Sequence, residues 1–215
     1  MIKPWIVALA LFTAAACNVS SVGVEGSGVS ASEDRQVAAF EAVALSGSFA
    51  VEIEVGPARS VRVEADDNIV PIVRTEVVGD VLKISSQQNF STRGPIKVRV
   101  STPRLIAVEH SGSGSIEARA IVAESFTASL DGSGLVRLAG RADTLTASID
   151  GSGSLEAADL ATTGTTVSLS GSGGAKVHAS ERVVATVSGS GAVQHAGGAK
   201  DVVSNIHGSG SVTPI

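Results

Sequence analysis

The sequence contains one cysteine, one tryptophan, one methionine and no tyrosine, and aromatic residues make up only 3% of its 215 residues. Because a single cysteine cannot form an internal disulfide, the fold must be stable without one. The scarcity of aromatic side chains removes the platforms on which single-stranded nucleic acid stacks. The net charge is −5, with acids and bases interspersed and no basic cluster, which argues against binding to nucleic-acid phosphates.

Small and β-branched residues are abundant instead. Apolar residues make up 43% of the chain, mainly Val, Ala, Ile and Leu, and there are 24 glycines and 6 prolines. Such side chains suit a narrow interior between closely spaced strands. The many glycines indicate frequent turns rather than long helices. The length is that of one domain of ordinary size.

Residues 1–16 have the pattern of a secretory signal peptide. Lys3 supplies a positive charge, residues 5–12 form an apolar run too short to span a membrane, and residues 13–16 are small. The sole cysteine, Cys17, follows directly, as in a bacterial lipobox, where the sulfur is acylated and the cysteine becomes the mature N-terminus. In the alternative interpretation, an ordinary signal peptidase cleaves the chain and Cys17 is incidental.

The segment after the signal peptide predicts a lipid anchor site at Cys17 and a flexible tether over residues 17–36, which are rich in Ser, Gly and Val. Asn18 resembles the residue found after the cysteine in Gram-negative lipoproteins of the outer membrane. We therefore expect an exported protein anchored by lipid in the outer membrane, facing either the periplasm or the cell surface.

A β pattern begins at residue 37. Residues 50–55, 61–65 and 96–100 alternate apolar and polar side chains, as half-buried strands do. Gly79-Asp80 lies between two further apolar runs and is a typical hairpin turn. No stretch here has a convincing helical period.

Six Gly-Ser-Gly tripeptides then recur at steps of 20, 19, 20, 18 and 19 residues. Their first glycines are Gly112, Gly132, Gly151, Gly171, Gly189 and Gly208. On both sides of each tripeptide, alternate positions are mostly apolar and the positions between them are polar. This regularity predicts an all-β fold, a parallel β-solenoid with coils of ~19 residues and Gly-Ser-Gly corners over residues 106–215. Gly26-Ser27-Gly28 lacks a following alternating run and is not counted as a coil.

Several motifs together resemble the bacterial putative auto-transporter adhesin head GIN domain family. They run from Phe40 to Phe49-Ala50-Val51, through residues 65–68, 75–82 and 95–98, to Pro103-Arg104-Leu105 and the first Gly-Ser-Gly. The resemblance covers residues 37–215. It implies a β-helix-like fold and a location in the cell envelope, and it carries over no catalytic residues.

Two carboxylates suggest a calcium site. Asp131 and Asp150 stand directly before the corner in adjacent coils, so stacking would bring them ~5 Å apart. The equivalent positions in the other coils hold Ser or His, and aspartate before glycine is also an ordinary turn residue. The pair is therefore a candidate that contains only two ligands, and we expect no other cofactor.

The sequence offers no catalytic constellation. His110, His178, His195 and His207 are scattered, without the short spacing of a zinc site. The outward columns mix Ser, Thr, Glu, Arg, Lys and Gln without the focused carboxylate pair of a glycosidase. We therefore expect no enzymatic activity, although a carbohydrate-active enzyme on a β-helix remains an alternative.

These observations favour a non-enzymatic envelope lipoprotein that acts as an adhesin or a structural module and contacts polysaccharide or another envelope protein. A periplasmic docking scaffold is a further alternative. The last coil ends in Thr213-Pro214-Ile215 without a capping helix, and an uncovered strand edge can pair with another chain. Formation of a homo-oligomer is therefore a further expectation.

Overall fold

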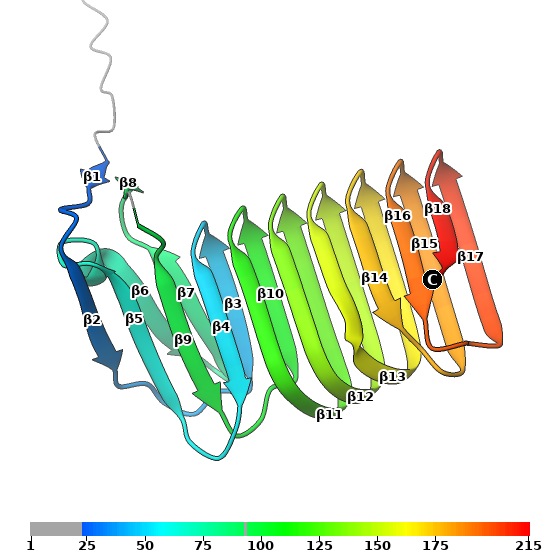
Figure 1. Ribbon diagram of the computed structural model, residues 1–215, viewed down its shortest axis with the longest axis horizontal. Coiled ribbons are helices and arrows are strands. Elements are labelled where there is room, and N and C mark those ends of the chain that lie inside the picture. Colours follow the sequence, from blue (N-terminus) through cyan, green and yellow to red (C-terminus); the bar gives the residue numbers. More distant parts are fainter. Residues whose placement is uncertain (1–22, 93) are drawn as a thin grey trace, which may run out of the picture.

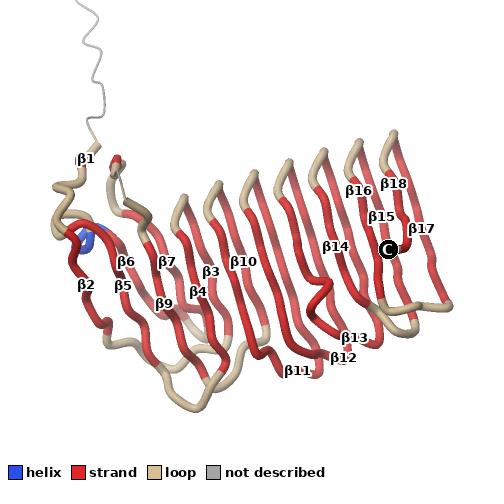
Figure 2. Tube along the Cα trace, viewed as in Figure 1, coloured by secondary structure: helices blue, strands red, loops and turns tan. Residues whose placement is uncertain are grey.

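The computed structural model describes residues 23–92 and 94–215, which form an elongated stack of strands (Figure 1). Residues 1–22 lie outside the described residues, so the predicted signal peptide and Cys17 are not part of this description. Within residues 23–92 and 94–215, the one helical element is a 3-10 turn, η1 (Val70–Ile72), and the other elements are strands (Figure 2). No helix in the described part of the chain is long and apolar enough to cross a membrane.

Each coil has a strand that runs into a glycine corner and a strand that leaves it. The first set of strands forms a parallel sheet, here called the approach sheet, and the second set forms the return sheet. Three long strands, β11 (Ser115–Gly132), β12 (Leu135–Gly151) and β13 (Ser154–Gly171), bend on the side opposite the corners. Each of them therefore contributes its first part to the return sheet and its second part to the approach sheet.

The other solenoid strands belong to one sheet each. The approach sheet also contains β3 (Ala42–Gly47), β10 (Ala107–Gly112), β15 (Arg182–Gly189) and β17 (Asp201–Gly208). The return sheet also contains β4 (Ala50–Val55), β14 (Gly174–His178), β16 (Ala192–Ala196) and β18 (Ser211–Pro214). The corner glycines of successive coils pair with one another, so the predicted β-solenoid with strands in parallel register is confirmed, with about five turns.

The N-terminal end breaks the parallel pattern. In the return sheet, β9 (Lys97–Thr102) pairs with β4, and β5 (Ser60–Asp66) and β2 (Ser30–Arg35) follow as antiparallel strands. In the approach sheet, β7 (Val81–Ser86) pairs with β3, and β6 (Val73–Val78) lies antiparallel to β7. Gly79 turns this hairpin with φ +62°, which confirms the predicted turn. A small parallel pair, β1 (Val24–Glu25) and β8 (Phe90–Ser91), lies beside this end.

The prediction of a flexible tether was wrong for residues 23–36. Strand β2 lies here and pairs with β5 along its full length. The Ser27 amide donates to Asn68 Oδ1 at 2.9 Å, and Asn68 Nδ2 donates to the Glu25 carbonyl at 2.7 Å. Local composition does not reveal this docking, because the hydrogen-bond partners lie about forty residues away in the sequence.

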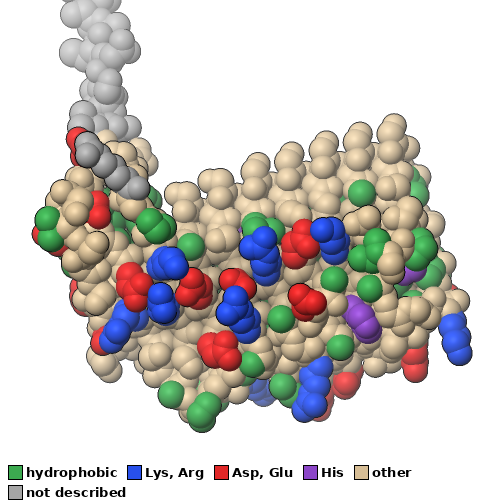
Figure 3. Space-filling model, viewed as in Figure 1, with side chains coloured by type: hydrophobic (Ala, Val, Ile, Leu, Met, Phe, Trp, Pro, Cys, Tyr) green, Lys and Arg blue, Asp and Glu red, His purple; other side chains and the backbone are tan. Residues whose placement is uncertain are grey.

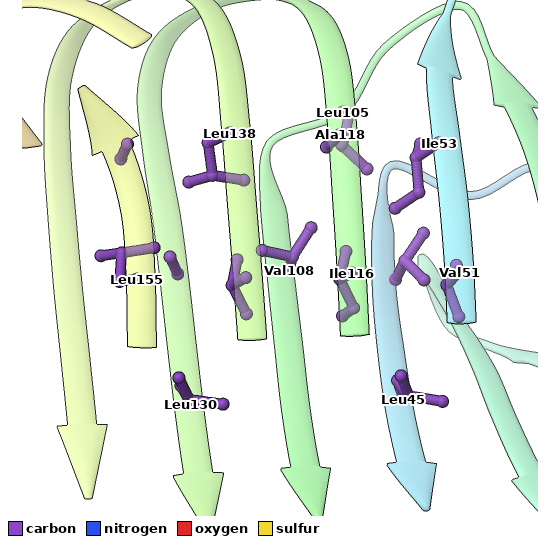
Figure 4. Packing of buried hydrophobic residues seen from close by; sticks show 14 of the residues in the cluster. Leu45, Val51, Ile53, Leu105, Val108, Ile116, Ala118, Leu130, Leu138 and Leu155 are labelled. Atoms are coloured by element: carbon purple, nitrogen blue, oxygen red, sulfur yellow. The ribbon is translucent and has the colours of Figure 1, made fainter. Parts of the chain in front are cut away.

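The core lies between the two sheets and is built from columns of Val, Leu, Ile and Ala. Figure 4 shows labelled members of this cluster, among them Leu45, Val108, Leu130 and Leu138, drawn from successive coils. Because each coil repeats the inward positions of the one before, every apolar side chain packs on an equivalent neighbour. Full burial of such a side chain contributes roughly 1.5–3 kcal/mol, so the column is the main source of stability.

Glycine is required at the corners for two reasons. The first glycine of each Gly-Ser-Gly has φ between +110° and +132°, where other residues are strained. A Cβ at these glycines would also lie 2.2–2.6 Å from the carbonyl oxygen of the glycine in the preceding coil. The corners therefore stack closely only when neither of two neighbouring coils carries a side chain there.

A seventh corner was missed in the sequence because it has only one glycine. Gly47, with φ +129°, pairs with Gly112 in register, so Ser46-Gly47-Ser48-Phe49 forms the first corner of the stack. Phe49 stands where later coils have their second glycine. Its ring stacks on Phe90, with centroids 5.7 Å apart and an interplanar angle of 17°. A large side chain fits here because Phe90, rather than another glycine corner, lies on that side.

Substitution of a central corner glycine should destabilise the solenoid. In Gly151→Ala the Cβ would lie 2.5 Å from the Gly132 carbonyl oxygen, on a backbone with φ +112°. We expect the free energy of unfolding in urea to fall by about 2–6 kcal/mol, since strain and overlap each cost roughly 1–3 kcal/mol. Gly164→Ala, in the coil that follows this corner, is the matched control, because no atom lies within 4 Å of its Cβ position. Equal losses in the two variants would contradict this account of the corner.

One core column contains a histidine with an unpaired nitrogen. His110 is 2% exposed, its Nδ1 lies 3.5 Å from the Leu45 carbonyl, and its Nε2 has no hydrogen-bond partner. A Cβ on Gly134 would lie 2.1 Å from this Nε2, so the second glycine of the next corner provides the space for the ring. In the next coil Leu130 fills the same place against Gly153.

We therefore expect His110→Leu to raise the free energy of unfolding by about 1 kcal/mol, because an unsatisfied buried polar atom costs roughly 1–3 kcal/mol. A leucine side chain suits this position, since the residues in register on either side of His110 are Leu45 and Leu130. Urea denaturation at neutral pH measures the change. The reverse substitution Leu130→His serves as the control and should destabilise; a loss of stability in His110→Leu would refute the account.

Candidate interaction surface

The candidate calcium residues are adjacent but isolated. Asp131 and Asp150 pair in register in the approach sheet, and both are exposed. Their neighbours in the same row are Ser111 and Ser170. Within residues 23–92 and 94–215, no group of three or more His, Cys, Asp or Glu side chains gathers. Calcium takes six to eight oxygen ligands, so this pair alone supplies a minority of a site.

The four histidines do not converge either. His110 and His195 are buried in different coils, and Nδ1 of His195 has no partner. His178 lies at the end of β14, where its Nδ1 accepts from the Thr162 amide at 3.4 Å. His207 lies on β17, the exposed last strand of the approach sheet. Their arrangement does not suit a shared metal ion or a proton-transfer relay.

A row of charged side chains crosses the outer face of the return sheet. Strand pairing places them in register from the N-terminal end of the stack to β14. This charged ladder consists of Asp34, Arg62, Arg99, Glu52, Glu117, Arg137, Glu156 and Lys176. Figure 3 shows Lys, Arg, Asp and Glu intermixed along the middle of this face. The repeat period predicts only the part of this row from Glu117 to Lys176. The rest could not be predicted, because the strand order β2-β5-β9-β4 is not the chain order.

Hydrogen-bonded ion pairs hold the ladder in place. Arg62 donates to both carboxylate oxygens of Asp34, at 2.7 and 2.8 Å. These hydrogen bonds keep the pKa of the Asp34 carboxyl below its ordinary value of 3.8, and they raise the pKa of Arg62. Arg119 likewise pairs with Glu117 at 2.6 Å, which raises the pKa of Arg119. Exposed pairs of this kind add little stability, so their effect is to fix where each charge lies.

Like charges adjoin at two places in the ladder and recruit partners from the flanking rows. Glu52 and Glu117 are directly opposite in register, and Lys97 contacts Glu52 at 3.1 Å. Arg62 and Arg99 are also opposite, and Arg99 contacts Glu64 at 3.2 Å. Since like charges opposite one another are destabilising, these outside partners offset the repulsion.

An open hollow of about 850 Å³ lies over the N-terminal half of the ladder. Its lining includes Asp34, Glu54, Arg59, Arg99 and Arg119, from four different strands and the loop before β5. Arg59 makes no ion pair with another described residue, so its guanidinium is available to an incoming group. The hollow is broad, polar and exposed, unlike the enclosed apolar pockets that hold small ligands.

The outer face of the approach sheet is different in chemistry. Rows of hydroxyl side chains lie in register across β11, β12 and β13. They are Thr127, Thr146 and Thr166 in one row and Ser129, Ser148 and Ser168 in the next. The two faces of the solenoid therefore present different surfaces, one crossed by a row of charges and one with rows of hydroxyl side chains.

The comparisons with known proteins agree with this architecture. The model of the family described as "Putative auto-transporter adhesin, head GIN domain" matches residues 39–199. The chain belongs to this family. The matched residues run from just before β3 through β16 and stop before β17 and β18, and the resemblance recognised in the sequence is confirmed. No match to the chain was found among curated proteins.

Solved structures share the head GIN fold at low identity. A putative adhesin from Bacteroides fragilis is 19% identical, with a TM-score of 0.72 over 90% of this chain and 100% of the other. A putative lipid binding protein from Parabacteroides distasonis is 21% identical, with a TM-score of 0.60 over 89% of this chain and 99% of the other. A putative adhesin from the same organism is 23% identical, with a TM-score of 0.58 over the same shares. These likenesses establish the fold.

Proposed function

We propose that this protein is a non-enzymatic, lipid-anchored envelope protein of adhesin type, whose head GIN domain binds another envelope macromolecule through the return sheet. The observation that carries this proposal is the charged ladder, a fixed row of eight in-register charges on one exposed face. A repeated surface of this kind supports many weak contacts at once, whose combined strength exceeds that of each contact.

The chemistry of the face favours a charged partner. The ladder contains both signs of charge, and Arg59 at its edge has no ion-pair partner among the described residues. Phe40, Phe49 and Phe126 are fully buried, so they cannot stack on sugar rings. A second envelope protein with a complementary charge pattern fits these features better than a neutral polysaccharide.

Catalysis has less support on the same surface. Glu52 and Glu117 are neighbouring carboxylates, as a glycosidase requires, but each is paired with a cation and only partly buried. A general acid of that kind lies in an apolar environment, whereas both of these side chains lie at the surface beside a cation. Cleavage of an envelope polysaccharide by the purified protein, abolished by Glu117→Gln, would replace the binding proposal with an enzymatic one.

The ladder should govern binding. We expect the double substitution Arg99→Glu and Arg119→Glu to weaken binding of the purified protein to isolated cell envelopes by about three- to tenfold at low salt. Arg182→Glu and Lys200→Glu form the matched control. They make the same change of net charge at the start of β15 and directly before β17, away from the charged ladder. Binding is measured by co-sedimentation at low and high salt. Equal loss in both double variants, or binding that survives protease treatment of the envelopes, would contradict a specific protein partner for the ladder.

Anchoring should depend on Cys17. Cys17→Ser removes the only sulfur that could be acylated, so the protein should move from the membrane fraction to the soluble fraction of lysed cells. Ser20→Ala, three residues away, is the control and should remain with the membrane. Fractionation followed by mass measurement of the mature N-terminus gives the readout. A Cys17→Ser protein that stays membrane-bound would sink the anchoring proposal and leave the ladder proposal untouched.

A further inference from the structure

The C-terminal end of the solenoid exposes apolar side chains whose equivalents one coil earlier are buried in the core. Val202 and Ile206 in β17 are 41% and 42% exposed. The residues that pair with them one coil earlier, Val183 and Val187, are both 0% exposed. The inward columns of the core thus end at an apolar surface on β17, the strand at the red end of Figure 1.

The backbone at this end is also unpaired. Among the described residues, β17 pairs only with β15 and β18 pairs only with β16. The outer edge of β17 therefore presents a row of N–H and C=O groups over eight residues without a neighbouring strand. An exposed strand edge of this length, beside apolar side chains, is a template for pairing with another strand.

The opposite end offers a different surface. The edge of the approach sheet there is β6, which carries an exposed ion pair between Arg74 and Glu76 at 2.6 Å. There the core is covered by η1 and the antiparallel strands, and Ile69, Val70 and Ile72 are all buried. The outermost strand of the return sheet, β2, carries Glu33 and Asp34 and blunts its own edge with charge. A head-to-tail contact would therefore cover the apolar end with a closed, polar one.

We propose that the second copy of this chain occupies the open end, with the two β17 strands pairing antiparallel about a two-fold axis at Ser204. Opposite residues of an antiparallel pair point to the same face, so inward residues meet inward residues. Val202 of one copy then lies opposite Ile206 of the other, and the contact occurs twice. Asp201 lies opposite His207, which places a carboxylate beside an imidazole donor at both ends of the pair.

This register is selected by the sequence of β17. A shift of one residue would place the inward apolar residues opposite outward polar ones. A shift that centres the pair on Asn205 would put Val202 opposite Gly208, and one that centres it on Val203 would put Val202 opposite Ser204. Only pairing about Ser204 matches both the apolar residues and the charges.

The return sheet does not continue across this interface. Pro214 in β18 has no backbone N–H to donate, and β18 has only four residues. The approach sheet alone becomes continuous through the pair, and the charged ladders of the two copies remain exposed. The inference is therefore independent of the partner proposed for the ladder.

The test uses the full chain with Cys17→Ser, so that neither an acyl group nor a disulfide at this residue joins two copies. Sedimentation equilibrium over a hundredfold range of concentration should show a monomer–dimer equilibrium. Ile206→Lys should raise the dissociation constant by at least about tenfold, because two lysines enter the paired apolar surface. Val122→Lys, at an exposed valine in β11, should leave the dissociation constant unchanged. A monomer at every concentration, or a series of larger oligomers from head-to-tail stacking, overturns the proposal.

Cysteine cross-linking tests the register even if Ile206→Lys misfolds. At the two-fold axis, the Cα atoms of Ser204 in the two copies would be about 4.5–5.5 Å apart, within the range of a disulfide. In the Cys17→Ser chain, mild oxidation should therefore cross-link Ser204→Cys into dimers. Asn205→Cys should stay monomeric on a denaturing gel, because its copy lies diagonally beyond disulfide range. Cross-linking of Asn205→Cys, or failure of Ser204→Cys to cross-link, overturns the pairing about Ser204.

Discussion

The close stacking of backbone at the glycine corners is the constraint on which the rest of the structure depends. Strands in a parallel sheet lie about 4.8 Å apart, and the corner must repeat at that distance as well. A Cβ at the first corner glycine would overlap the carbonyl oxygen of the preceding coil, so no side chain fits between neighbouring corners. With the corner fixed, each later residue of a coil lies above its equivalent in the one before, and core columns and surface rows follow from this register.

The same register organises the surface. A charge at one outward position lies beside the equivalent position of the next coil, so single charged residues scattered over the sequence become one row. Ion pairs such as Asp34–Arg62 and Lys97–Glu52 then hold that row in a fixed pattern. The stack thus presents a long, ordered row of charges across one face.

The two ends of the stack show how a repeating structure must stop. At the N-terminal end, antiparallel strands and a 3-10 turn cover the last core layer, and Phe49 with Phe90 fills the place of a glycine corner. At the C-terminal end the core columns reach solvent at Val202 and Ile206. The proposed pairing of two copies would cover these exposed columns.

The sequence by itself determined the repeating part of this protein. The period of Gly-Ser-Gly and the alternation around it predicted the coils, their register and the inward columns, because these depend on residues close together in the chain.

The tertiary structure decided what depends on distant residues. It revealed the corner at Gly47, where Phe49 hides the tripeptide, and the docking of residues 24–35 on Asn68 and β5. It also decided the order of β2, β5, β9 and β4, which assembles the N-terminal half of the charged ladder from strands that are not consecutive. Periodicity is local and can be read along the chain, whereas strand order is set by which distant edges bury the most apolar surface.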